Sequence, residues 1–78
     1  MGAHIMNGRV FLDGRPVEGC RSEVLEREKG HECDECGEPA IGRFGVWGRN
    51  PHTRNPVHVA FWLCSTHHWA LLKKAPAR

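Results

Sequence analysis

The sequence predicts a single small α+β domain. Its 78 residues suffice for one domain at most. Large apolar residues occupy every second position of 57–63, a pattern typical of a half-buried β-strand. The next segment, 65–74, has apolar residues at helical spacing and ends in two lysines, which suit the negative end of a helix dipole. Nine glycines and five prolines indicate many turns and short elements.

The N-terminal part predicts a hairpin over 9–17. Asp13-Gly14 supplies residues that tolerate positive φ between two short apolar runs, which favours a tight turn. Pro16 restricts its strand to a sheet edge, because proline has no N–H to donate. Residues 1–5 resemble an expression-vector remnant before a native start at Met6, so His4 is not considered as a ligand.

A short helix is expected over 19–29. Ser22 is a plausible N-cap and Gly30 can end the helix. Cys20 is expected to be a free thiol packed beside this helix.

Two further strands and a helix are expected in the C-terminal part. The strands, 40–47 and 57–63, are joined by the polar turn segment 48–56. Ser65 or Thr66 is expected to cap the helix that runs to about Lys74.

Two pairs of residues have the spacing of metal ligands. Cys33-x-x-Cys36 is followed by Gly37, which allows the chain to turn back under a bound ion. Cys64-x-x-His67 lies where the last strand becomes the last helix. A set of three cysteines and one histidine is typical of structural Zn²⁺, so the sequence predicts a metal-stabilised domain.

Alternatives to this ligand set remain open. His68 could replace His67 as the fourth ligand. The C-x-x-C pair could be a redox motif, or the four cysteines could form two disulfides. No export signal or long apolar run is present, which favours a reducing, cytoplasmic compartment where cysteines more often bind metal.

The order of knuckle, hairpin and ligand-bearing helix resembles the treble-clef zinc finger superfamily. The resemblance covers residues 33–74 and implies a ββα core around one Zn²⁺. After the expected remnant over 1–5, the chain is expected to comprise an N-terminal hairpin and helix over 6–32 and a zinc-binding, treble-clef-like core over 33–78, within one compact domain. The resemblance implies little about activity, since treble clefs serve many functions.

The segment 63–68, followed by Lys73, also resembles the zinc-bearing part of HNH endonucleases. That resemblance implies His67 as a zinc ligand and His68 as the ligand of a catalytic divalent ion. No Asp precedes His52 or His58, so the Asp-His pair that the family requires is missing. The sequence therefore indicates a protein that is not an enzyme, with a nuclease as a minor alternative.

The distribution of charge favours an anionic partner. Residues 1–36 carry five Lys/Arg and eight Asp/Glu, a net charge of −3, whereas residues 37–78 carry six Lys/Arg and one Glu, a net charge of +5. Phosphate contacts with DNA or RNA are expected from a basic set on the hairpin and last helix: Arg43, Arg49, Arg54, Lys73 and Lys74. A further contact is expected from Arg78 in the tail. Trp47 or Trp62 could stack on a base, although Trp62 and Trp69 are expected mainly in the core.

A protein-interaction adaptor is the alternative function. The acidic N-terminal extension exceeds what a minimal finger needs and could dock on a protein partner or a second copy of the chain. The sequence does not reveal the oligomeric state.

Overall fold

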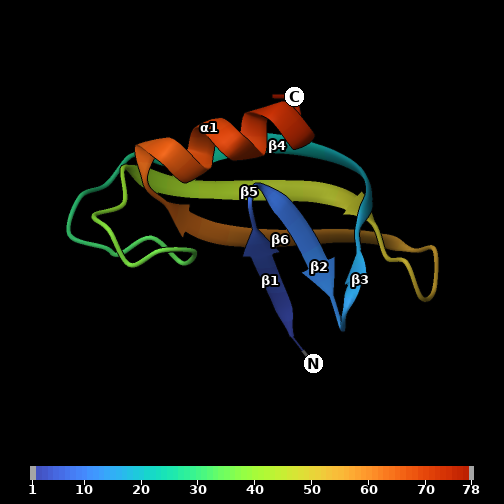
Figure 1. Cartoon of the computed structure of the whole chain (residues 1–78). Helices are drawn as coiled ribbons and strands as arrows, with labels where there is room; N and C mark the ends of the chain where they lie inside the picture. Colours follow the sequence, from blue (N-terminus) through green and yellow to red (C-terminus); the bar gives the residue numbers. More distant parts are fainter. Residues whose placement is uncertain (1, 78) are drawn as a thin grey trace.

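The computed structural model describes residues 2–77 and contains two three-stranded antiparallel sheets and one C-terminal helix (Figure 1). Met1, part of the expected remnant, and Arg78, an expected phosphate contact, lie outside the described residues. In chain order the elements are β1 (Ala3–Met6), β2 (Arg9–Leu12), β3 (Arg15–Pro16), β4 (Glu18–Glu26), β5 (Gly42–Arg49), β6 (Pro56–Leu63) and α1 (Ser65–Lys74).

The first sheet has the strand order β1-β2-β3 and confirms the hairpin over 9–17. Asp13 and Gly14 adopt φ values of 48° and 85°, the left-handed conformations that a two-residue hairpin turn requires. The edge strand β3 contains Pro16, as expected. Residues 3–6 form β1, and Ile5 is buried in the core. That residues 1–5 are an expression-vector remnant stays a prediction.

The helix expected over 19–29 is wrong, because this segment contains strand β4, which pairs with β5. Ser22, expected as an N-cap, is buried in the strand, and its hydroxyl donates to the carbonyl of Ala75 at 2.6 Å. Its backbone N–H donates to the carbonyl of Pro76. Long-range pairing with β5 on one edge and the C-terminal tail on the other therefore outweighs the local capping pattern.

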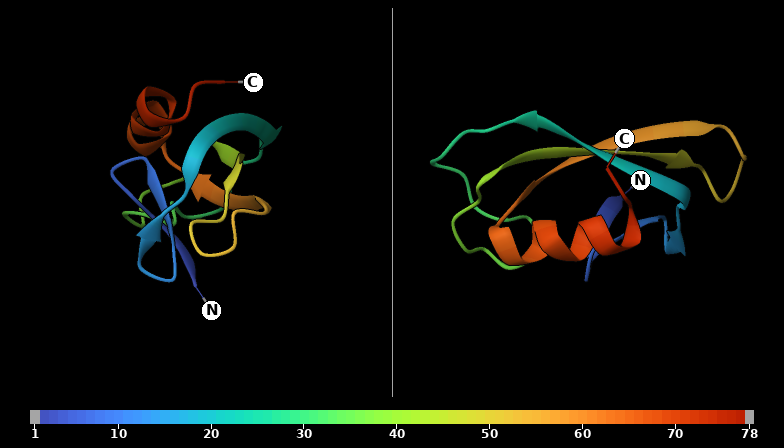
Figure 2. Two further views of the ribbon diagram at one scale, coloured as in Figure 1. Left: turned by 90° about the vertical axis from the view of Figure 1, so that its right-hand side faces the viewer. Right: turned by 90° about the horizontal axis from the view of Figure 1, so that it is seen from above.

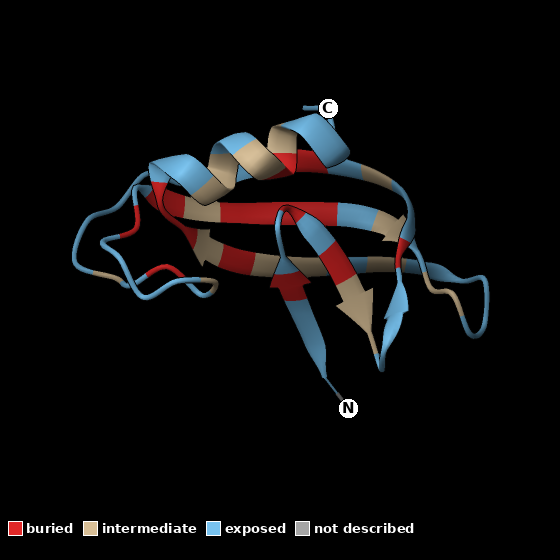
Figure 3. Cartoon of the chain, in the orientation of Figure 1, coloured by how far each residue is buried: buried red, intermediate tan, exposed pale blue. Residues whose placement is uncertain are grey.

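The second sheet has the order β4-β5-β6 and confirms both strands expected in the C-terminal part. A strand of the segment 6–32 thus completes the sheet formed by the segment 33–78. One face of this sheet is buried: Phe44 and Val46 on β5, and Phe61 and Leu63 on β6. These side chains form one cluster with residues of the first sheet and of α1 (Figure 3). The first sheet and α1 therefore cover the same face, which is called the core face below.

Helix α1 lies along the core face (Figure 2) and buries Leu71 completely. Its N-cap is Cys64, without a side-chain capping bond, so the cap expected at Ser65 or Thr66 is wrong. Because the chain enters the helix directly from β6, the cysteine takes the extended cap conformation.

The expectation that Trp69 lies in the core is also wrong: it is 63% exposed on α1. Helix α1 turns Leu71 inward, which leaves Trp69 on the solvent side. Trp62 is partly buried and stacks on His31 with ring centroids 3.5 Å apart.

Within residues 2–77, no helix combines the length and the apolar character that a membrane span requires.

Candidate metal centre and the outer face of the second sheet

Four side chains converge where the segment after β4 meets the start of α1. Their donor atoms, three Sγ and one ring nitrogen, all lie within 4.8 Å of one another: Cys33, Cys36, Cys64 and His67. The Sγ atoms of Cys36 and Cys64 are 3.7 Å apart, and Nδ1 of His67 lies 3.2 Å from Sγ of Cys64. The structure thus brings together the four residues that the sequence predicted as one ligand set.

These separations fit one tetrahedrally coordinated ion. Two sulfurs bound to one Zn²⁺ are about 3.8 Å apart, and a bound sulfur and nitrogen about 3.6 Å apart. The Sγ atoms of Cys36 and Cys64 are 3.7 Å apart, and Nδ1 of His67 lies 3.6 Å from Sγ of Cys33 and, somewhat closer, 3.2 Å from Sγ of Cys64. All four cysteines of the described chain are free thiols, so the alternative of two disulfides is wrong for this structure. The donor set therefore forms a candidate site for one metal ion.

The backbone around Cys33 and Cys36 forms a tight turn. Gly37 adopts a φ of 81° and its N–H donates to the carbonyl of Cys33 at 2.9 Å. The positive φ explains why glycine follows the second cysteine. Asp34 holds the turn against β6, because its N–H donates to the carbonyl of Trp62 while its carboxylate accepts the N–H of Trp62. The turn is thereby fixed beside the strand that leads to Cys64.

The pKa values of the Cys33 and Cys36 thiols are shifted in opposite directions. Burial raises the pKa of the Cys33 thiol, but backbone hydrogen bonds, chiefly from Cys64 and Cys36, outweigh it and lower the pKa to about 7. A backbone hydrogen bond from Glu38 lowers the pKa of Cys36, but burial and the neighbouring sulfurs of Cys64 and Cys33 outweigh it and raise that pKa to about 11. The negative charge of one thiolate thus disfavours ionisation of the next thiol, and a divalent cation would relieve that repulsion.

The structure assigns His67, and not His68, to the cluster. The ring of His68 stacks on Phe44 in the core, with centroids 3.9 Å apart. Burial, together with the charge of Arg27, lowers the pKa of His68 below its ordinary value. The two other histidines weighed for a nuclease site lie elsewhere: His52 contacts the carbonyl of Leu12 through Nε2, and His58 lies on β6.

Glu35 contacts the cluster from behind His67. Its Oε1 lies 3.7 Å from Nε2 of His67, the nitrogen that faces away from the sulfurs. The same oxygen accepts the backbone N–H of Asn7, in the turn between β1 and β2. Oε2 of Glu35 is buried and has no hydrogen-bond partner. A carboxylate in this position orients a ligating histidine and links the first sheet to the site.

Replacement of Glu35 by glutamine is expected to weaken metal binding about ten-fold or more, because a carboxylate behind a ligating histidine fixes its tautomer and raises its basicity. Competition with a chromogenic chelator measures the affinity. Glu38→Gln is the matched control, since Glu38 is exposed and contacts the turn through its backbone N–H and carbonyl. Equal affinities of the two variants would show that Glu35 does not support His67.

Cys20 lies outside the cluster and is a free thiol, as predicted, but on β4 and not beside a helix. Its Sγ contacts the carbonyl of Val17 at 3.2 Å. Burial raises its pKa despite the nearby charge of Arg9, so this thiol is poorly reactive.

The basic residues predicted to contact phosphates lie on two sides of the sheet. Arg43 and Arg49 occupy β5 at odd-numbered positions, opposite to the core-facing Phe44, so both lie on the outer face. Arg54 lies in the loop between β5 and β6. Lys73 and Lys74 lie in the last turn of α1, on the side of the core face. One surface therefore does not contain all five.

The outer face also carries residues that the sequence reasoning missed, because 19–29 was expected to be helical. Arg21 and Glu23 on β4 pair with Trp47 and Gly45 on β5. The alternation of polar and less polar residues over 20–24 is the signal that would have placed Arg21 and Glu23 on the outer face of a strand.

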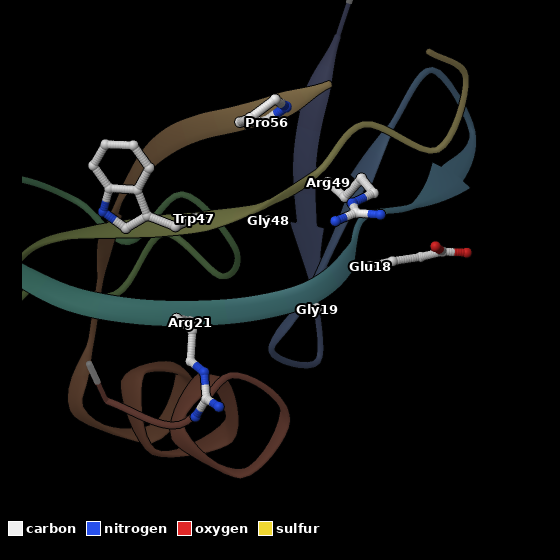
Figure 4. A pocket seen from close by; sticks show the side chains of 7 residues that line it. All are labelled: Glu18, Gly19, Arg21, Trp47, Gly48, Arg49 and Pro56. Carbon is white, nitrogen blue, oxygen red and sulfur yellow. The ribbon is translucent and has the colours of Figure 1, made fainter. Parts of the chain in front are cut away.

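A shallow hollow of about 600 Å³ lies at one end of the outer face, between the ends of β4, β5 and β6 (Figure 4). Its lining residues are Glu18, Gly19, Arg21, Trp47, Gly48, Arg49 and Pro56. The lining of the hollow thus includes two arginines, one aromatic ring and one carboxylate.

Comparison of the chain with known protein families, with curated proteins and with solved structures gave no match in any of the three. The treble-clef and endonuclease resemblances therefore stay predictions, and the function has to be inferred from the geometry of the two sites described above.

Proposed function

We propose that this protein is a small zinc-stabilised domain that binds nucleic acid through the outer face of the β4-β5-β6 sheet. The observation that carries the proposal is the alignment of Arg43, Trp47 and Arg49 on one side of β5, opposite to the buried core. Guanidinium groups contact phosphates and an aromatic ring stacks on bases, so this combination suits a polynucleotide.

Zn²⁺ is the metal that the donor set favours. Three thiolates and one imidazole at tetrahedral separations form a closed site, which is typical of structural Zn²⁺ and leaves no position for a substrate. The order of cysteine turn, β5-β6 hairpin and α1 supports a treble-clef arrangement. In this proposal the ion holds Cys64 at the end of β6 and so fixes the sheet whose outer face binds the ligand.

The length of the outer face suits an extended ligand. Arg43 and Arg49 are six residues apart on one strand, a span of about 20 Å. Arg21 on the neighbouring strand β4 pairs with Trp47 and adds a third basic residue to the face. The face also carries Glu23, but its carboxylate accepts the indole N–H of Trp47 at 2.8 Å and lies 3.7 Å from Nε2 of His58. This carboxylate therefore organises the aromatic residues of the face.

The test is a titration of the zinc-loaded protein with a labelled oligonucleotide, followed by fluorescence anisotropy at several salt concentrations. Binding is expected to weaken as salt rises, and Arg49→Ala is expected to reduce the slope of log K against log salt by about 0.7 to 0.9, the contribution of one phosphate. Arg15→Ala on β3 is the control of equal charge change. Affinity that is indifferent to salt, or equal losses in both variants, would contradict the proposal.

A protein partner is the second candidate, favoured by the exposure of Trp69 on α1. Aromatic side chains are enriched at protein interfaces, and an indole that is 63% exposed offers such an anchor. Light scattering of the wild type and of Trp69→Ala would detect self-association. A mass above the monomer that falls in the variant would favour this function.

A further inference from the structure

The hollow at the end of the outer face has a composition that restricts what can occupy it. Its volume of about 600 Å³ is that of a small-molecule site and not of an extended groove. Trp47 and Arg49 lie two residues apart on the same face of β5, about 7 Å along the strand. Figure 4 shows the indole ring of Trp47 at one end of the hollow and the guanidinium of Arg49 near the opposite end, whereas the guanidinium of Arg21 projects from β4 away from both.

Trp47 is held in place by its neighbours. Its N–H donates to Oε1 of Glu23, and its ring stacks on His58 with centroids 4.0 Å apart and planes 14° apart. The indole therefore does not have to be ordered when a ligand binds, which reduces the entropic cost of association. With 36% of its surface exposed, it still presents aromatic area to the hollow.

Gly45 explains why this stack can form. A Cβ at position 45 would lie 2.5 Å from Nε2 of His58 and 3.2 Å from a methyl carbon of Leu25. The absence of a side chain lets the imidazole lie across β5, where it meets Trp47. Gly45 is thus a positioning residue for the aromatic end of the hollow.

The two ends of the hollow match the two ends of one nucleotide. We propose that the hollow binds one nucleotide of a single-stranded nucleic acid, with the base against Trp47 and the phosphate at Arg49. This inference rests on the proposed function and names its ligand. A single strand is required because the bases of a duplex are stacked on one another and cannot lie on a side chain.

The remaining lining residues agree with this occupant. Glu18 adds a carboxylate that repels a second phosphate but accepts hydrogen bonds from the hydroxyl or amino groups of a nucleotide. A side chain at position 48 would displace the buried residue Val17 on the core side of the sheet, since its Cβ would lie 2.5 Å from a methyl carbon of Val17. The hollow is therefore a site of mixed charge that selects a ligand with both an anionic and an aromatic part.

The experiment compares a labelled single-stranded oligonucleotide with its duplex by fluorescence anisotropy at low salt. The wild type is expected to bind the single strand at least ten-fold more tightly. Trp47→Ala is expected to weaken single-strand binding about ten-fold, within the range measured for loss of one base–aromatic stack. Trp47→Phe should retain most of the affinity, because it keeps a stacking ring. Trp69→Ala, which removes an exposed indole from α1, should change the affinity less than two-fold.

A second variant tests the stack without removing the indole. Gly45→Ala should displace His58 and weaken single-strand binding several-fold while zinc content stays at one ion per chain. Zinc content and thermal unfolding of every variant identify any that fails to fold.

The outcomes separate this inference from the proposed function. Equal affinity for duplex and single strand, or equal losses in Trp47→Phe and Trp47→Ala, overturns the inference. If Arg49→Ala still weakens binding in that case, the proposed nucleic-acid function stands. Absence of binding to both forms overturns the inference and the proposed function together.

Discussion

Removal of the metal by a chelator is expected to unfold at least residues 33–74. Structural Zn²⁺ contributes an apparent ~10–16 kcal/mol to small fingers near neutral pH. The balance of buried apolar area against chain entropy in a domain of 78 residues comes out near zero. Without the ion, three thiols and an imidazole would remain as a weakly packed cluster between β6 and the turn at Cys33. Loss of the circular dichroism signal and of a cooperative thermal transition measures the effect.

Two cysteine variants provide a matched pair for this prediction. Cys64→Ser removes a buried ligand at the start of α1 and is expected to bind the metal far more weakly and to unfold readily. Cys20→Ser removes a thiol outside the cluster and should keep one ion per chain, as counted by native mass spectrometry. A spectrum unchanged after confirmed loss of the ion, or equal metal content in both variants, would contradict the structural role of the metal.

Gly8→Ala is expected to destabilise the protein by about 3 kcal/mol or more. Gly8 has a φ of 78°, and a Cβ there would lie 2.3 Å from the carbonyl oxygen of Ala70 and 2.6 Å from the N of Leu71. The left-handed conformation costs an alanine roughly 1–2 kcal/mol, and overpacking adds about 1–3 kcal/mol. Helix α1 cannot move away easily, because it buries Leu71 and carries His67.

Gly14→Ala is the control, since it changes the corresponding turn residue between β2 and β3. Its φ is 85°, but nothing lies within 4 Å of the added Cβ, so only the conformational cost of about 1–2 kcal/mol is expected. Urea unfolding of the metal-loaded proteins measures both losses. If the two variants lost equal stability, the turn between β1 and β2 would not be packed tightly against α1. A larger loss in Gly8→Ala would confirm that the first sheet and the helix that carries His67 form one unit.

The ligand set could be predicted because it depends on local spacing. Cys33 and Cys36 are three residues apart around a turn that Gly37 permits, and Cys64 and His67 are three residues apart at a strand-to-helix junction. The choice between His67 and His68 needed the fold. Only the packing of His68 on Phe44 shows which imidazole faces the sulfurs.

The outer face of the second sheet was harder to predict, because strand pairing is non-local. The segment 19–29 has local features of a helix, yet β5 and the C-terminal tail provide pairing partners on both of its edges. That error concealed Arg21 and Glu23, which complete the outer face beside Trp47. The same limitation affected Trp69, whose exposure is decided by which side of α1 packs on the core.

The sequence by itself determined the two pairs of candidate ligands, Cys33 with Cys36 and Cys64 with one of two adjacent histidines, the hairpin turn at Asp13-Gly14, and the order of cysteine turn, hairpin and helix. Each of these follows from contacts between residues close in the chain or from conformations that only certain residues adopt. The tertiary structure alone decided that β4 joins β5, that the first sheet docks on α1 through Gly8, and that Trp47, Arg49 and Arg21 line one hollow. Those arrangements join residues that are distant along the chain, and local spacing carries no information about which distant strands will pair.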